Sequence, residues 1–400
     1  MYQYMREPEI SQAALKTALR NLRYSPTPTR SRNPLEHLLL VELIIRSPGI
    51  PLSECNRTYA LQHVLIDLIT AAYTEQRRRL SLPIPDPKAT KATVHDYINV
   101  DLNGFQVELI AWSWLYHLYG RYDLELNAAD FWQQGAFEER TRRRYQNHAL
   151  GRLTEQLHNH EWEARKYYRK RHLHLKLPTM SQPVIGRDDI LGDLQQSVDT
   201  IFPVIYQVSG EEGIGKTTLI RELLRRQIKT ETLDDLFWFS QPESVEYIQQ
   251  ELLAGFEVTS LEAANSIAAD YRIALILDGI ETLESDRAGL NNLLYRLPHL
   301  MIYMTHRHQI FLPAPVHHVA LKGLKPADAQ KLMHYLKMTH RGYDFIPDEV
   351  EMILESSKGN PGRMKVELQN LVELEKVFCG RHAGSSHTEC ISNNSCSRNG

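Results

Sequence analysis

One glycine-rich stretch constrains this chain more than any other feature of its sequence. Residues 210 to 217 read G-E-E-G-I-G-K-T, which has the spacing G-x-x-x-x-G-K-T. The apolar, β-branched run 204–208 before it is typical of a buried parallel strand, and the run 218–228 after it repeats Leu and Ile at helical spacing. A strand, a glycine loop and a helix in this order are the context in which the spacing predicts a phosphate-binding loop.

The chemistry of this loop follows from its residue types. Its glycines let the backbone turn sharply and approach a phosphate without Cβ clashes, and its N–H groups lie at the positive end of the helix dipole. Lys216 is expected to neutralise the β- and γ-phosphates, and the Thr217 hydroxyl to ligate Mg²⁺. The candidate nucleotide-binding residues of the loop are Gly210, Glu211, Glu212, Gly213, Ile214, Gly215, Lys216, Thr217 and Thr218.

Composition sets weaker limits. Apolar residues make up 42% and charged residues 24% of the 400 residues, as in soluble globular proteins, and the formal net charge is -3. This balance neither favours nor excludes a nucleic-acid partner. The four cysteines lack paired spacing, the N-terminus has no apolar signal core, and the most apolar runs are too short to span a bilayer. We therefore expect a cytoplasmic protein with no membrane association.

The first hundred residues predict a helical module and nothing more specific. Apolar residues recur at helical spacing over 10–22, 34–45 and 59–80, with stretches rich in Pro and Ser between the first two. We find no catalytic constellation in residues 1–100, so a packed helical domain is the expected reading.

Residues 101–178 have a different character. An aromatic-rich helix is expected to end near Gly120, a short helix to begin after Asn127 as its N-cap, and Gly135 to separate it from a basic helix. A short helix, a turn containing Gly and a basic helix form the outline of a helix-turn-helix. The candidate DNA contacts at the start of the basic helix are Arg140, Arg142, Arg143 and Arg144.

Local charge supports this outline without deciding it. Residues 138–176 hold eleven Lys or Arg against five Asp or Glu, and the run 165–172 interleaves aromatic and cationic side chains. A basic helix is also a common solvated surface. Double-stranded DNA and a protein partner therefore both remain open for this region.

The second half of the expected nucleotide site lies further along the chain. The apolar strand 273–277 is followed by Asp278, which places a carboxylate where Mg²⁺ would be held. Glu281 is the candidate to polarise an attacking water, and Arg307, after the next expected strand, to pair with a γ-phosphate. Gly279 fills the position directly after Asp278, where many relatives of this fold carry a second acid, so these residues predict nucleotide binding and leave hydrolysis open.

Six motifs follow one another in the C-terminal half of the chain: Gly186-Arg187, G-E-E-G-I-G-K-T-T at 210–218, L-F-W-F-S at 236–240, L-I-L-D-G-I-E at 275–281, M-T-H-R at 304–307, and G-N-P at 359–361. In this order they resemble the STAND class of P-loop ATPases, near its NB-ARC and related bacterial branches. The resemblance covers residues 184 to about 376. A weaker likeness to the helix-turn-helix modules of bacterial members covers 114–171.

The resemblance implies a fold and a use for the motifs. The fold class is α/β, with a P-loop NTPase core over 184–315, a parallel sheet ordered 5-1-4-3-2, and a helical lid over 316–378. An adenine pocket is implied near Ile185, Arg187 and Pro361. ATP or ADP with Mg²⁺ would be the cofactors, and exchange between the two nucleotides would drive a switch.

The end of the chain departs from the family pattern. STAND members usually continue into a winged-helix domain and a long repeat sensor, whereas this chain ends soon after the expected lid. Residues 379–400 are polar, and we expect them to be disordered. Truncation of a longer protein is one hypothesis for this ending.

Two functions fit these features. The first is an ATP/ADP-binding regulatory switch of the STAND type, Mg²⁺-dependent, with slow or absent ATP hydrolysis and self-association through the NTPase core. The second is a DNA-binding transcription regulator whose P-loop domain controls oligomerisation.

Overall fold

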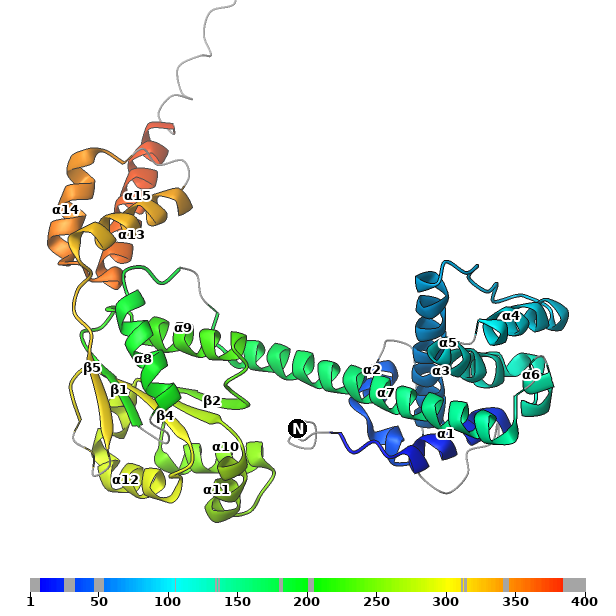
Figure 1. Cartoon of the computed structure of the whole chain (residues 1–400). Coiled ribbons are helices and arrows are strands. Elements are labelled where there is room, and N and C mark those ends of the chain that lie inside the picture. Colours follow the sequence, from blue (N-terminus) through cyan, green and yellow to red (C-terminus); the bar gives the residue numbers. More distant parts are fainter. Residues whose placement is uncertain are drawn as a thin grey trace, which may run out of the picture. The chain divides into compact units, whose positions relative to one another are not determined.

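A computed structural model describes residues 8–24, 33–46, 54–104, 106–133, 135, 137–179, 183–200, 205–310, 312, 315–340 and 345–383 (Figure 1). The chain divides into two compact units, which we call unit 1 (Met1–Arg169) and unit 2 (Lys170–Gly400). None of the described helices is long and apolar enough to cross a membrane.

Unit 1 is helical in the residues that the structure describes. Its α-helices are α1 (Gln12–Tyr24), α2 (Leu39–Ile45), α3 (Glu54–Arg79), α4 (Lys91–Asn103), α5 (Val107–Leu115), α6 (Ala128–Gln133) and the first part of α7 (Glu139–Lys176). Shorter turns are the 3₁₀-helices η2 (Pro34–His37) and η4 (Tyr122–Leu124), and the π-helix η3 (Tyr116–Gly120) that extends α5. One hydrophobic core contains residues from Leu15 to Leu157.

The expected domain boundary near residue 100 falls inside α4. The hydrophobic core of unit 1 contains residues from before and after this boundary. Ile98 and Leu102 of α4 are buried in the same cluster as Trp112 of α5 and Trp132 of α6. The helical N-terminal module and the expected helix-turn-helix region therefore share their packing within unit 1.

Two of the local features expected in residues 101–178 are present, the N-cap at Asn127 and a basic helix after Gly135. The expected N-cap forms, because Asn127 accepts a hydrogen bond from the Asp130 backbone N–H at 2.9 Å. After Gly135, the expected basic helix is α7, which runs for 38 residues. Tyr145 of this helix stacks on Trp132, with ring centroids 6.2 Å apart.

Unit 2 contains a parallel sheet of five strands in the order β2-β3-β4-β1-β5. Read from the β5 edge, this order is 5-1-4-3-2. The strands are β1 (Ile205–Ser209), β2 (Asp235–Ser240), β3 (Ile273–Asp278), β4 (Met301–His306) and β5 (Val316–Ala320). The two strands expected at 204–208 and 273–277 are found as β1 and β3, each within one residue of its predicted C-terminal end, and Val204 lies outside the described residues.

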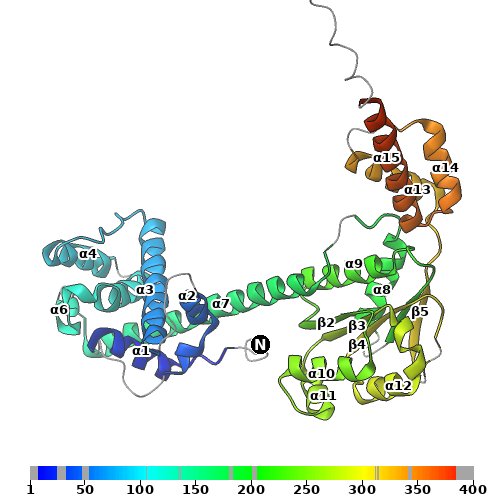
Figure 2. The same cartoon turned by 180° about the vertical axis from the view of Figure 1, so that it is seen from behind.

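Helices cover both faces of this sheet (Figures 1 and 2). On one face, α8 (Asp188–Thr200) and α9 (Lys216–Lys229) bury Leu191, Leu219 and Leu223 against Tyr206 and Ile276. The other face is covered by the helices α10 (Val245–Phe256), α11 (Leu261–Asp270) and α12 (Arg287–Arg296). Because both faces are buried, the strands can be apolar runs without alternation, which is why the sequence revealed them.

Three further helices, which we call the lid, follow β5. They are α13 (Pro326–Thr339), α14 (Pro347–Ser357) and α15 (Pro361–Ala383), and each begins with a proline in its first turn, where the missing N–H costs no helical hydrogen bond. The lid has its own core around Leu332, Met364 and Leu368. The helix α15 includes positions 379–383 of the expected disordered tail, and positions 384–400 lie outside the described residues.

Candidate functional site

The register of the sheet brings the predicted site residues to one edge. Ser209 at the end of β1 pairs with His306 of β4, and Asp278 at the end of β3 pairs with Thr305 of β4. The carboxyl ends of three neighbouring strands therefore lie side by side, with the glycine loop following one of them. This edge is where open parallel sheets bind their ligands.

The glycine loop has the backbone that its sequence predicts. Gly213 and Gly215 adopt positive φ values of 78° and 100°, which disfavour residues with a Cβ. Gly215 is the N-cap of α9, so the loop leads directly into the N-terminus of that helix. The Lys216 Nζ donates to the carbonyl oxygens of Gly210 and Glu211, at 2.8 and 3.0 Å. The Lys216 ammonium group therefore lies over the loop, at the position where the oxygens of a bound phosphate would be expected.

Thr217 and Asp278 are brought together although 61 residues separate them. The Thr217 hydroxyl lies 2.8 and 3.0 Å from the two carboxylate oxygens of Asp278. Thr305 holds this carboxylate from the other side, because its hydroxyl donates to Asp278 at 2.7 Å and accepts from the Gly279 N–H at 2.7 Å. A hydroxyl beside a fixed carboxylate is an oxygen pair of the kind that Mg²⁺ prefers.

The two remaining predicted side chains also meet at this edge. The Arg307 backbone N–H donates to the Glu281 carboxylate at 2.9 Å, and the Arg307 guanidinium donates to Glu212 of the glycine loop at 2.8 Å. His306 is buried, and its Nε2 lies 2.7 Å from the Glu284 carboxylate. The segment after β3, η5 (Ile280–Asp286), is thus tied to the end of β4 at two points.

The lid is attached directly to the glycine loop. The Gly362 N–H at the start of α15 donates to the Gly213 carbonyl at 2.9 Å, and the Asn360 amide donates to the Glu212 carbonyl at 2.9 Å. The approach is close, since a Cβ on Gly213 would lie 3.1 Å from the Cα of Gly362. A third link joins the Arg363 guanidinium to the Glu211 carboxylate at 3.0 Å.

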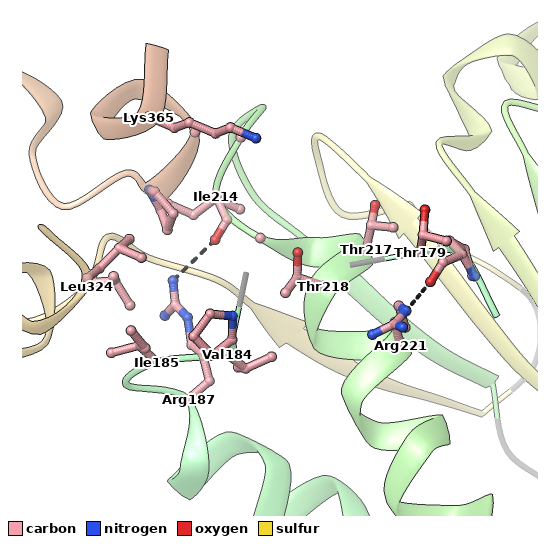
Figure 3. A pocket seen from close by; sticks show the side chains of 17 residues that line it. Thr179, Val184, Ile185, Arg187, Ile214, Thr217, Thr218, Arg221, Leu324 and Lys365 are labelled. Carbon is pink, nitrogen blue, oxygen red and sulfur yellow. Dashed lines mark hydrogen bonds between the residues drawn. The ribbon is translucent and has the colours of Figure 1, made fainter. Parts of the chain in front are cut away.

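A pocket of about 280 Å³ opens between the loop, the lid and the segment before α8 (Figure 3). Arg187 borders it and donates to the carbonyls of Ile214 and Lys322, at 3.3 and 2.7 Å. Lys365 of α15 faces the same space. The remaining lining residues include Val184, Ile185, Thr217, Thr218, Arg221, Leu324, Leu332 and Pro361. An apolar wall with a few cations is suited to a flat ring carrying anionic groups.

Burial shifts the pKa of two cations of this region, Lys216 and Arg187. It lowers the pKa of Lys216 from its ordinary value, and the nearby carboxylates of Glu281 and Asp278 oppose that shift. It also lowers the pKa of Arg187, while Asp328 acts in the opposite direction. A half-buried ammonium beside a loop of backbone N–H groups at a helix N-terminus favours an anionic partner.

The structure also contributes residues that sequence reasoning missed. Thr305 holds Asp278, and Asn360, Arg363 and Lys365 lie beside the loop; Thr305 and Asn360 stand inside motifs noted for other positions. Arg307 and Pro361, which neighbour them in the same motifs, could be identified from the sequence. The charge of Arg307 and the fixed backbone conformation of Pro361 indicate their roles without knowledge of the fold. The roles of the missed residues depend on contacts with distant segments.

The candidate DNA contacts lie in unit 1. Arg140, Arg143 and Arg144 are exposed at the start of α7, and Arg142 is half-buried. Arg143 pairs with Glu139 one turn earlier at 2.9 Å, and the Arg144 guanidinium lies over the Tyr145 ring. The start of α7 therefore presents three exposed arginine side chains within five consecutive residues, two of which have a contact on their own helix.

Comparisons with known proteins add little to this geometry. No protein-family model matches the chain, and no curated protein matches it. Similar solved structures include a HORMA:CdnC:Trip13 complex from E. coli MS115-1, at 18% identity over 45% of this chain and 76% of that one, with a TM-score of 0.31. Another is AMPPCP-bound DnaA from Aquifex aeolicus, at 16% identity over 50% and 67%, with a TM-score of 0.34. TM-scores this low support no conclusion about the function of this chain. The P-loop NTPase-like character of unit 2 rests instead on its strand order, its glycine loop and the Asp278 carboxylate.

Proposed function

We propose that unit 2 binds an adenine nucleotide with Mg²⁺ and acts as a regulatory switch of the STAND type, with slow or absent hydrolysis. The observation that carries this proposal is the contact between the Thr217 hydroxyl and the Asp278 carboxylate beside Lys216. These three groups come from two motifs, the glycine loop and the end of β3, and their meeting at one edge of the sheet is the arrangement that a phosphate site with Mg²⁺ needs.

Each part of the nucleotide has a candidate binding region. The backbone of residues 210–215 and Lys216 would hold the phosphates, and Thr217 with Asp278 would hold Mg²⁺, which neutralises phosphate charge when bound. The apolar wall formed by Ile185 and Pro361 suits the adenine ring. Thr218 lines the same pocket, one residue further along α9.

Two features support a switch over a fast enzyme. Gly362 and Asn360 form hydrogen bonds to the phosphate loop, so a change in the conformation of the loop would also move the start of the lid helix α15. Glu281, the candidate catalytic carboxylate, already accepts the backbone N–H of Arg307. A carboxylate held in this way is less available to activate water.

The Lys216→Ala variant tests the site. We expect ATP and ADP affinity to fall by at least about 100-fold, because a charged partner of the phosphates is removed. Titration calorimetry of the full chain measures this, with Lys229→Ala as the control, since Lys229 is an exposed lysine at the other end of the same helix. Unchanged affinity in Lys216→Ala would contradict the assignment. Mass spectrometry of the nucleotide that co-purifies would show whether the resting state holds ADP.

A second candidate function, binding of duplex DNA by unit 1, is supported by the exposed Arg140, Arg143 and Arg144. Changing these three to Ala is expected to weaken DNA binding and to reduce the slope of log affinity against log salt by about 3. Fluorescence anisotropy over a salt series measures that slope. If the wild-type chain shows no salt-dependent binding, the region is better described as a protein-binding module.

A further inference from the structure

The phosphate loop carries two carboxylates, and each of them holds an arginine from another part of unit 2. The Glu212 carboxylate pairs with Arg307, at the end of β4, with 2.8 Å between the charged atoms. The Glu211 carboxylate pairs with Arg363, in the first turn of α15, at 3.0 Å. A loop that should attract phosphates thus presents two negative charges of its own.

Both pairs are open to water. The exposed fractions of the side chains are 57% for Arg307 and 82% for Glu212, and 51% for Arg363 and 68% for Glu211. Exposed ion pairs are weak because water and salt screen them. An arginine in such a pair exchanges its partner readily, and a phosphate offers the same bidentate geometry as a carboxylate with more charge.

The backbone of each arginine is held by a hydrogen bond that is independent of its ion pair with the loop. The Arg307 N–H is fixed by Glu281, and the Arg363 N–H is capped by Asn360 at 3.3 Å. Both backbones are therefore anchored beside the loop, so each guanidinium can change partner without any movement of its helix or strand. Geometry of this kind favours exchange of side-chain partners over rearrangement of the fold.

We propose that Glu211 and Glu212 act as internal substitutes for nucleotide phosphates, holding Arg363 and Arg307 until the phosphates of a bound nucleotide take the two arginines from them. This inference rests on the proposed nucleotide site and deepens it. Arg307 extends from the strand end where a γ-phosphate would be contacted, so Glu212 competes with ATP more than with ADP. Arg363 belongs to the lid, so its transfer from Glu211 to phosphate reports the bound nucleotide to the lid.

The competition predicts a gain of affinity when a carboxylate is removed. Glu212→Gln is expected to bind ATP up to about fivefold more tightly than the wild type, with a smaller gain for ADP, because an exposed pair of this strength no longer has to be broken. Glu211→Gln is expected to show a gain of similar size. Titration calorimetry of the full chain with Mg·ATP and Mg·ADP measures both.

Simple repulsion between Glu212 and phosphate would also give a gain, so a double-mutant cycle separates the two explanations. If Arg307 is the group that Glu212 holds, the gain from Glu212→Gln disappears in an Arg307→Ala background. The corresponding cycle pairs Glu211→Gln with Arg363→Ala. Glu262→Gln is the matched control, because Glu262 pairs with Arg296 on the same unit away from the loop, at 2.6 Å, and its loss should leave ATP affinity unchanged.

The outcomes are distinct. Gains that vanish in the arginine backgrounds support the exchange. Gains that persist there, or an absence of gain in both glutamine variants, overturn it while the nucleotide site stands. Unchanged ATP affinity in Lys216→Ala is a separate result, since it removes the proposed function itself.

Discussion

The two units place paired charges in opposite surroundings. In unit 1, Arg77 and Asp101 form an ion pair at 2.6 Å whose side chains are 1% and 0% exposed. In unit 2, the pair Arg307–Glu212 has a similar separation, yet more than half of each side chain is exposed. The same chemical contact therefore has two different consequences, because desolvation makes a buried charge costly to leave unpaired.

The partners around each pair make the difference sharper. Asp101 also accepts hydrogen bonds from Tyr73 at 2.5 Å and Ser113 at 2.7 Å, and the Arg77 Nε donates to the Pro83 carbonyl at 2.7 Å. Such a network fixes the packing of α3, α4 and α5. Around Arg307 the contacts of the guanidinium are few and solvated, which suits a group that must change partner.

The largest effect is expected at the buried pair. Asp101→Asn keeps the shape of the side chain but leaves the Arg77 charge without its partner, and we expect the unfolding free energy of unit 1 to fall by about 3–5 kcal/mol. Urea unfolding followed by tryptophan fluorescence measures this, since four of the five tryptophans lie in unit 1.

Glu139→Gln is the control for this change. Glu139 pairs with Arg143 at 2.9 Å, but the two side chains are 69% and 73% exposed, so we expect a loss well below that of Asp101→Asn. Equal losses in the two variants would show that burial does not distinguish the pairs, and the comparison between the units would fail.

A second prediction concerns pH and His117, which lies in the π-helix of unit 1 and contacts the Tyr73 hydroxyl at 3.1 Å. Burial, with help from Arg77 and Arg121, lowers the pKa of His117 to about 3. The unfolded chain then binds more protons than the folded one between about pH 3 and 6.5, so this residue makes stability fall as the pH falls. Burial also raises the pKa of Asp101 to about 6, which acts in the opposite direction below pH 6.

His117→Gln separates these two contributions. Asp101 is present in both proteins, so the difference in unfolding free energy between the wild type and His117→Gln isolates the histidine. We expect the wild type to lose about 2 kcal/mol relative to the variant between pH 7 and pH 5. A difference that stays constant over this range would mean that His117 takes up its proton with the same pKa in the folded and the unfolded chain, which contradicts the lowered pKa.

Sequence reasoning succeeded where local spacing carries the chemistry. The glycine loop needs its residues at fixed positions, and the buried strands are apolar runs, so both are visible in the chain itself. The contact between Thr217 and Asp278 then follows from the parallel sheet, because Asp278 ends β3 and Thr217 begins the helix after the loop at the carboxyl end of β1, and both strands pair with β4.

It failed where a role depends on a distant partner. Arg77 belongs to the run Arg77-Arg78-Arg79, which reads as the solvated end of a helix, yet only Arg77 meets Asp101 of α4 and is buried. Glu161 lies in a basic, polar stretch but is 0% exposed, because it accepts the N–H groups of Leu39 and Leu40 at the start of α2. Neither contact leaves a pattern in the sequence.

The smallest effect is expected at the exposed pairs of unit 2. Without nucleotide, Glu211→Gln and Glu212→Gln should each change the stability of unit 2 by less than about 1 kcal/mol, because water solvates the arginine that is released. Hydrogen exchange of peptides from β1 and β3 measures the opening of this unit directly, and the same variants then gain affinity for ATP. A stability loss above about 2 kcal/mol in either variant would mean that the carboxylate is a fixed structural partner of its arginine, as Asp101 is of Arg77, and not an exchangeable one.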